Sequence, residues 1–195
     1  VIDYPKILQQ FLVNWIIVPS RYKKTREAYS EIWTDSGSPL INSCLDLGKK
    51  VHEKSNIPVE VAMRYQFPSI KESLLKLKNK GCEEIFVVPL YPHYAGATAA
   101  TASDQFFKAL MRERWQPAVR VVEPYFEKPI YIEALAKSVE EAYASKKTKP
   151  EILVCSYHGV PKRYLMQGDP YHCQCQKTTR LLKERLGWKD TNIIT

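Results

Sequence analysis

Short apolar runs alternate with longer amphipathic segments along this chain, and the alternation constrains the fold more than any other feature. The run at 84–90 holds a near-continuous Ile-Phe-Val-Val pattern, which is typical of a parallel strand buried on both faces. Further strands are predicted at 59–65, 119–122 and 152–155. Strands that alternate with helices predict an α/β protein with a mainly parallel sheet.

The predicted helices fill the segments between these strands. Apolar residues at helix-like spacing predict a helix over 4–33 that is interrupted at Pro19 and Ser20. Ser69 suits the N-cap of a helix that runs to Lys80 and ends at Gly81. Other helices are predicted at 41–54, 97–114, 129–145 and 178–186, and a last strand at 192–195.

The chain is expected to contain two α/β domains, over 1–125 and 126–195, with the boundary near 123–130. Both ends look cut, because no initiator Met precedes Val1 and the last residues read as an unpaired strand. We therefore expect a piece of a longer protein in which both domains are incomplete.

The charge of the chain favours an anionic partner. It carries 29 Lys and Arg against 21 Asp and Glu, a net charge of +8. Nucleic acid, an anionic membrane surface or a small molecule with carboxylates would each suit it, but no nucleic-acid-binding motif is present. The absence of a membrane-spanning apolar run and of a signal peptide favours a cytoplasmic protein. The helix with Trp15 could belong to the core or lie on a membrane surface.

Polar and aromatic side chains follow the carboxyl ends of the predicted strands, where α/β sheets bind ligands. They are Arg64, Tyr65, Tyr91, His93, Tyr94 and His158, joined by Arg21 and Lys24 at the predicted helix break. Tyrosines offer flat walls, cations bind carboxylates, and a histidine is a base or metal ligand near neutral pH. A large flat anionic ligand fits this set. Neither a serine nucleophile elbow nor a glycine-rich phosphate loop is present.

Several motifs that span nearly the whole chain occur in a fixed order. They are I-W at 32–33, G-S-P-L at 37–40, M-R-Y at 63–65, L-Y-P-H-Y at 90–94, S-Y-H-G-V-P-K-R-Y at 156–164 and G-D-P-Y at 168–171. In this order they resemble the ferrochelatase family. The resemblance implies two similar Rossmann-like domains of three layers around a porphyrin cleft. It also implies a lyase of haem biosynthesis that inserts ferrous iron into protoporphyrin IX or coproporphyrin.

The resemblance also implies a role for each matching residue. His158 matches the family's catalytic histidine, and the matching porphyrin-binding residues are Arg21, Lys24, Ser38, Arg64, Tyr65 and Tyr91. A metal enters the macrocycle only after both pyrrole N–H protons leave, so a base must face the ring centre. His158 could be that base, or it could bind the iron first.

The cysteines raise the question of an iron–sulfur cluster. The five cysteines should be free thiols or metal ligands in a reducing compartment. Some ferrochelatases hold a [2Fe–2S] cluster, and Cys155, Cys173 and Cys175 could contribute to one here. A full set needs four ligands, and Ala95 and Gly96 occupy the loop where such relatives often place a cysteine.

Other functions stay open at this point. The chain could be a non-catalytic tetrapyrrole-binding or carrier module, or a chelatase that inserts cobalt into a modified tetrapyrrole. The family's later histidine and glutamate, and its opening strand, have no counterpart in this sequence. We therefore expect this stretch of sequence alone to be inactive, the full protein to bind porphyrin and ferrous iron, and its contact with a membrane to be peripheral.

Overall fold

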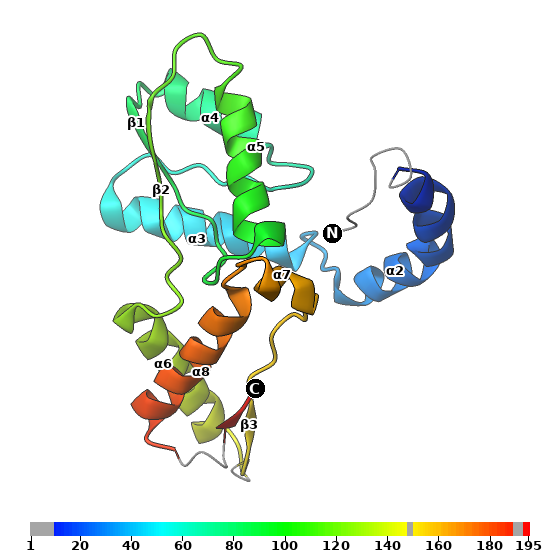
Figure 1. The fold of residues 1–195 in the computed structure, drawn as a ribbon. Coiled ribbons are helices and arrows are strands. Elements are labelled where there is room, and N and C mark those ends of the chain that lie inside the picture. Colours follow the sequence, from blue (N-terminus) through cyan, green and yellow to red (C-terminus); the bar gives the residue numbers. More distant parts are fainter. Residues whose placement is uncertain (1–9, 148–149, 189–192) are drawn as a thin grey trace. The chain divides into compact units, whose positions relative to one another are not determined.

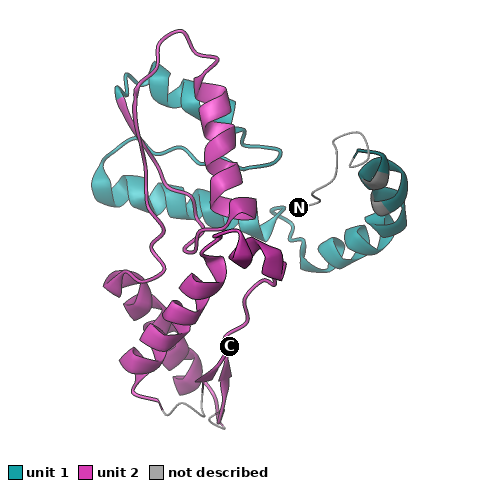
Figure 2. Ribbon diagram, in the orientation of Figure 1, with its two compact units in different colours: residues 1–83 teal, residues 84–195 magenta. Residues whose placement is uncertain are grey.

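The computed structural model describes residues 10–147, 150–188 and 193–195. Its chain divides into two compact units, Val1–Glu83 and Glu84–Thr195 (Figure 2). Short parallel strands alternate with helices along the chain (Figure 1), which confirms the predicted α/β class. The predicted boundary near 123–130 falls inside the second unit, and the domain division of the complete protein stays a prediction.

The first unit begins with a continuous helical segment. A π-helical stretch, η1 (Leu12–Ile17), runs directly into α2 (Val18–Ile32). The predicted break at Pro19 and Ser20 is wrong, because the helical segment continues through both residues from η1 into α2. Residues 4–9 of the predicted helix lie outside the described residues. No described side chain of α2 is buried.

Two further helices complete the first unit. Helix α3 (Pro39–Ser55) follows Ser38, and helix α4 (Ile70–Asn79) follows Ser69. The hydroxyl of Ser69 accepts a hydrogen bond from the Glu72 amide at 3.2 Å, which confirms the predicted N-cap. Gly81 has a φ of 75°, a left-handed conformation that ends the helix as predicted.

The strand predicted at 59–65 does not form, and only an isolated bridge joins Met63 to Ser69. A strand needs a neighbouring backbone to complete its hydrogen-bond ladder, and no strand is described in the first unit. Side chains of α4 hold the segment instead. The Ser73 hydroxyl donates to the Val61 carbonyl at 2.8 Å, which ties the segment to α4.

The first half of the second unit contains one strand pair. β1 (Glu84–Val87) and β2 (Ala118–Val121) are parallel, with Glu84 opposite Ala118. The connection between them contains η2 (Gly96–Ala100) and α5 (Thr101–Leu110). The predicted strand at 84–90 is thus present but ends three residues early.

The second half of the unit carries the helices that support the candidate site. They are α6 (Pro129–Ala144), α7 (Lys162–Met166) and α8 (Tyr171–Leu186), with the strands β3 (Leu153–Val154) and β4 (Ile193–Ile194). Helices α6 and α8 lie side by side (Figure 1). β3 and β4 are parallel, so the last strand is paired rather than unpaired, although residue 192 lies outside the described residues.

Helix α8 begins at Tyr171, well before the predicted start at 178. Gly168, with a φ of 91°, and Asp169 form the turn that precedes it, and a carboxylate oxygen of Asp169 accepts from the Tyr171 amide at 3.0 Å. Cys173 and Cys175 therefore lie on a helix. No helix among the described residues is long and apolar enough to cross a membrane.

Candidate active site

His158 lies on the loop that follows β3, past the strand's carboxyl end as the sequence predicts. Its side chain is exposed and lines an open hollow of about 450 Å³. Other residues that line this hollow include Cys155, Tyr157, Tyr171, Cys175 and Thr195. An exposed imidazole at the rim of a hollow can reach a bound ligand, so this loop is the candidate active site.

Two tyrosines beneath the loop hold it in place. The Tyr157 hydroxyl and the Thr179 hydroxyl are 3.0 Å apart and share a hydrogen bond. Burial raises the pKa of Tyr157 and of Tyr171, while a hydrogen bond from the His158 backbone acts in the opposite direction on the pKa of Tyr171. Both phenols therefore stay protonated at neutral pH. Tyr157 directly precedes His158 in the sequence, and Tyr171 contacts the His158 backbone.

His93 is buried, with only 8% of its surface exposed, rather than set in the wall of a cleft. Its Nε2 is 2.9 Å from the Thr178 hydroxyl, which in turn donates to the Phe126 carbonyl at 2.9 Å. The ring stacks on Phe126, with the centroids 6.1 Å apart. Burial lowers the pKa of His93, so the ring is neutral at neutral pH.

Two more hydrogen bonds anchor the loop that contains His93, and both use its backbone amides. The Gln174 side-chain oxygen accepts from the Tyr94 amide at 2.6 Å, and Asp169 accepts from the Gly96 amide at 2.8 Å. Tyr91, on the same loop, is 39% exposed. The residue pattern did not identify the anchoring side chains, which are Thr178, Thr179, Gln174 and Asp169. Of these, only Asp169 had a signal in the sequence, as part of the G-D-P-Y motif at 168–171.

Arg64 and Tyr65 lie together in the first unit. The Arg64 guanidinium carbon is 4.4 Å from the centre of the Tyr65 ring, a cation–π contact. The Arg64 Nε is buried and has no hydrogen-bond partner among the described residues. Tyr65 is 73% exposed, so the pair presents an aromatic face backed by a cation with unused donor capacity.

The other candidates of the first unit are Arg21, Lys24 and Ser38. Arg21 and Lys24 are exposed within α2, three residues apart on one side of the helix, and not at a break as predicted. Ser38 stands at the N-cap of α3 but makes no capping hydrogen bond with its side chain. The hydroxyl of Ser38 is thus not committed to the cap. The remaining candidates, Tyr91 and His158, belong to the second unit.

The cysteines do not form a ligand set. Residues two apart on an α-helix point about 160° away from each other. Cys173 is accordingly exposed while Cys175 is buried, and burial raises the pKa of the Cys175 thiol. No group of three or more Cys, His, Asp or Glu side chains in the described part of the chain could hold a metal ion. These residues do not fit a local [2Fe–2S] cluster.

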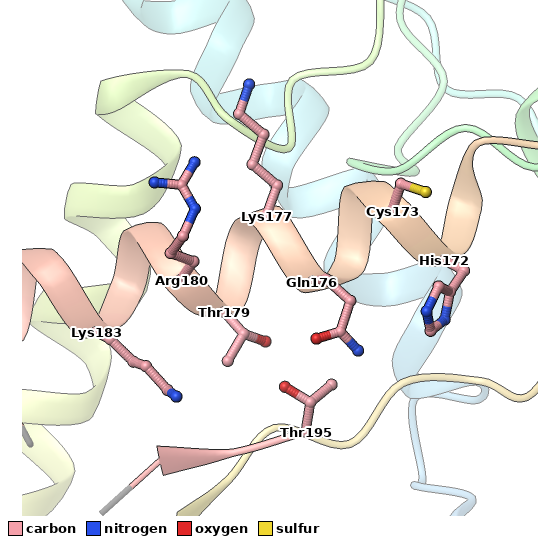
Figure 3. A pocket seen from close by; sticks show the side chains of 8 residues that line it. All are labelled: His172, Cys173, Gln176, Lys177, Thr179, Arg180, Lys183 and Thr195. Carbon is pink, nitrogen blue, oxygen red and sulfur yellow. The ribbon is translucent and has the colours of Figure 1, made fainter. Parts of the chain in front are cut away.

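A second open hollow, of about 670 Å³, lies along α8 and Thr195 (Figure 3). Figure 3 shows Gln176 and Thr179 on the side of α8 that faces Thr195, whereas Lys177 and Arg180 point away from it. Lys177 pairs with Glu127, and Arg180 pairs with Glu184 at 2.7 Å. Two cations of this basic helix are thus matched by carboxylates.

Comparison with known proteins extends these observations. The family model described as ferrochelatase matches residues 1–195. The chain is similar to the ferrochelatases of Rhodobacter capsulatus, at 50% identity, and of Allorhizobium ampelinum, at 44%, with all of the chain and 58% of each relative covered. It is 42% identical to that of Rhizobium meliloti, with 96% of the chain and 57% of the relative covered. The chain thus spans little more than half the length of these relatives. It belongs to the ferrochelatase family.

Proposed function

We propose that the protein containing this chain inserts ferrous iron into a porphyrin, the lyase step of haem biosynthesis. Family membership supports the reaction class. The observation that carries the proposal is His158, exposed at a hollow on a loop that two half-buried tyrosines, Tyr157 and Tyr171, hold in place. An exposed base on a fixed loop is what removal of the pyrrole protons requires.

The chain's own residues divide the work between binding and proton transfer. His158 accepts a pyrrole proton through its imidazole, or takes the arriving iron as its ligand. Arg21, Lys24, Ser38, Arg64, Tyr65 and Tyr91 are the proposed porphyrin-binding residues. Arg64, whose Nε has no described partner, is suited to a carboxylate or another acceptor on the ligand. The exposed rings of Tyr65 and Tyr91 are suited to the flat face of the macrocycle.

The test compares wild-type full-length protein with His158→Ala. Iron insertion is followed by the change in the porphyrin absorption spectrum, and porphyrin binding by fluorescence quenching. We expect His158→Ala to lower kcat by about 10²–10⁴-fold, the usual contribution of a positioned base, while porphyrin still binds. His52→Ala, which removes an exposed histidine of α3 in the first unit, is the matched control.

Other outcomes would identify the competing functions. Porphyrin binding without insertion in the wild type would indicate a carrier module. A wild-type preference for cobalt and a modified tetrapyrrole would indicate a cobalt chelatase. Equal kcat values for wild type and His158→Ala would refute the role of His158.

The [2Fe–2S] cluster at Cys155, Cys173 and Cys175 stays a prediction that the helix geometry of α8 does not support. The full-length protein, purified without oxygen, would decide it. Iron and acid-labile sulfide in equal amounts, with charge-transfer absorption that disappears in Cys173→Ser, would establish a cluster at this site. We expect neither signal to depend on Cys173.

Contact with the cytoplasmic face of a membrane is a further part of the proposal. Phe11, Trp15 and Tyr22 are 55%, 74% and 58% exposed on the helical segment that also carries Arg21 and Lys24. Aromatic and basic residues together favour an anionic lipid surface. Sedimentation with phosphatidylglycerol vesicles should fall in Trp15→Ser and not in Ile130→Ser, which removes an apolar side chain that is at least as exposed, at another site. Equal sedimentation of both variants would refute this contact.

A further inference from the structure

The buried His93 has no part in the function proposed above, yet it lies at the centre of the second unit's polar interior. Its Nε2 is 2.9 Å from the Thr178 hydroxyl on α8. The ring meets Tyr157 and Tyr171 edge to face, with centroids 5.5 Å and 6.0 Å apart. A histidine enclosed in this way cannot touch a porphyrin, so its role must act through its neighbours.

The hydrogen bonds determine where the proton of His93 resides. The Thr178 hydroxyl has a single proton, which it donates to the Phe126 carbonyl at 2.9 Å. Toward His93 the same oxygen can therefore only accept, and Nε2 must carry the proton. A neutral ring with its proton on Nε2 satisfies this arrangement, and burial, which lowers the pKa of His93, supports the neutral form.

The two tyrosines that pack on His93 connect it to His158. Tyr157 is the residue next to His158, and its hydroxyl bonds to Thr179, adjacent to Thr178 on α8. Tyr171 forms a hydrogen bond with the His158 backbone. The His93 ring therefore packs against the side chains that hold the His158 loop from two directions.

The same ring also fixes the loop that carries Tyr91. His93 follows Tyr91 by two residues, and the next amides of the loop are held by Gln174 and Asp169. The Tyr91 loop and the His158 loop are thus both attached to α8 and to its preceding turn, and His93 is the side chain common to both.

We propose that His93, protonated on Nε2 and bonded to Thr178, is a positioning residue that holds the His158 loop and the Tyr91 loop in register on α8. This inference rests on the proposed function for its kinetic consequences, because His158 is taken there as the base and Tyr91 as a porphyrin contact. Displacement of a reacting group by about 1 Å can cost about 10²-fold in rate.

The kinetic test uses the full-length protein with Thr178→Val, which keeps the shape but loses the hydroxyl, and Thr178→Ser, which keeps the hydroxyl. We expect Thr178→Val to lower kcat for iron insertion by about 10–10²-fold, and Thr178→Ser to retain most of it. Thr101→Val controls for loss of a threonine hydroxyl, because the Thr101 hydroxyl bonds to carbonyls of the preceding helical turn. Equal kcat for Thr178→Val and wild type would overturn the proposal, as would equal losses in the Val and Ser variants.

Two measurements decide the point even if a variant folds poorly or the chelatase proposal fails. Nitrogen-15 NMR of the wild type at neutral pH should show His93 neutral with the proton on Nε2; a proton on Nδ1 alone, or a charged ring, would overturn the inference. Amide hydrogen exchange of residues 156–160 should be at least about tenfold faster in Thr178→Val than in Thr178→Ser. Absence of iron insertion in the wild type would refute the proposed function while both of these results still test His93.

Discussion

Replacement of Gly48 by alanine tests how the segment before Arg64 and Tyr65 is held. A Cβ at Gly48 in α3 would lie 2.6 Å from the Val61 Cγ2, whereas ordinary contacts begin at 3.4 Å, so one partner must move by about 0.8 Å. Val61 cannot yield easily, because its χ1 is stiff and its carbonyl accepts the Ser73 hydroxyl. Helix α3 and this segment are therefore in close contact only because residue 48 has no side chain.

The expected change in the free energy of unfolding on Gly48→Ala is the sum of two opposing effects. Overpacking costs about 1–3 kcal/mol, and replacement of a helical glycine by alanine gains about 1 kcal/mol. We expect Gly48→Ala to lower the free energy of unfolding by about 0–2 kcal/mol in the wild-type background. In a Val61→Ala background the close contact is gone, and the same substitution should raise the free energy of unfolding by about 1 kcal/mol.

The assay is a double-mutant cycle measured by urea unfolding, with amide exchange of α3 as a local readout. A coupling energy of about 1–3 kcal/mol between positions 48 and 61 is expected. If Gly48→Ala changes stability equally in both backgrounds, the contact does not limit packing and the reasoning is refuted. Under the function proposed above, Gly48→Ala should also weaken porphyrin binding, because the displaced segment leads directly to Arg64 and Tyr65.

Three further predictions concern the second unit. Asp169→Ala removes the acceptor for the Gly96 and Tyr171 amides and should cost about 1–3 kcal/mol in urea unfolding; no change would contradict this capping role. Because the pKa of His93 is lowered from 6.5, the unfolded chain binds its proton first, so stability should fall as pH drops below about 6.5, with a smaller slope in His93→Gln. Burial raises the pKa of Tyr131 from 10.0 to about 12, so stability should fall as pH rises between these values, and Tyr131→Phe should lose this fall.

The sequence predicted elements well where local pattern and tertiary packing agree. The apolar run at 84–90 forms the strand β1 because β2 pairs with it. Helix α6 closely matches its predicted span of 129–145. The similar run at 59–65 lacks such a partner and forms no strand. Strand formation depends on a neighbour that hydrophobic periodicity alone does not reveal.

The candidate site was predictable only in part. Position after a strand and the family motifs identified His158, which is exposed at a hollow. The missed first turns of α8, residues 171–177, are mostly polar and bury only Cys175, so apolar periodicity gave no signal for them. The burial of His93 depends on α8, 85 residues away in sequence, and no local pattern could show it. The roles of the site residues remain predictions.

The anchoring of the 93–96 loop on α8 makes these two segments one transplantable unit. His93 bonds to Thr178, the Tyr94 amide to Gln174, and the Gly96 amide to Asp169. A chimera that exchanges residues 169–179 alone with a relative's would put three hydrogen bonds at risk, each worth about 1 kcal/mol, because the side chains of Asp169, Gln174 and Thr178 take part in them. Exchange of the loop together with residues 169–179 would preserve them, which sets the practical limits for recombining chelatase sequences in this region.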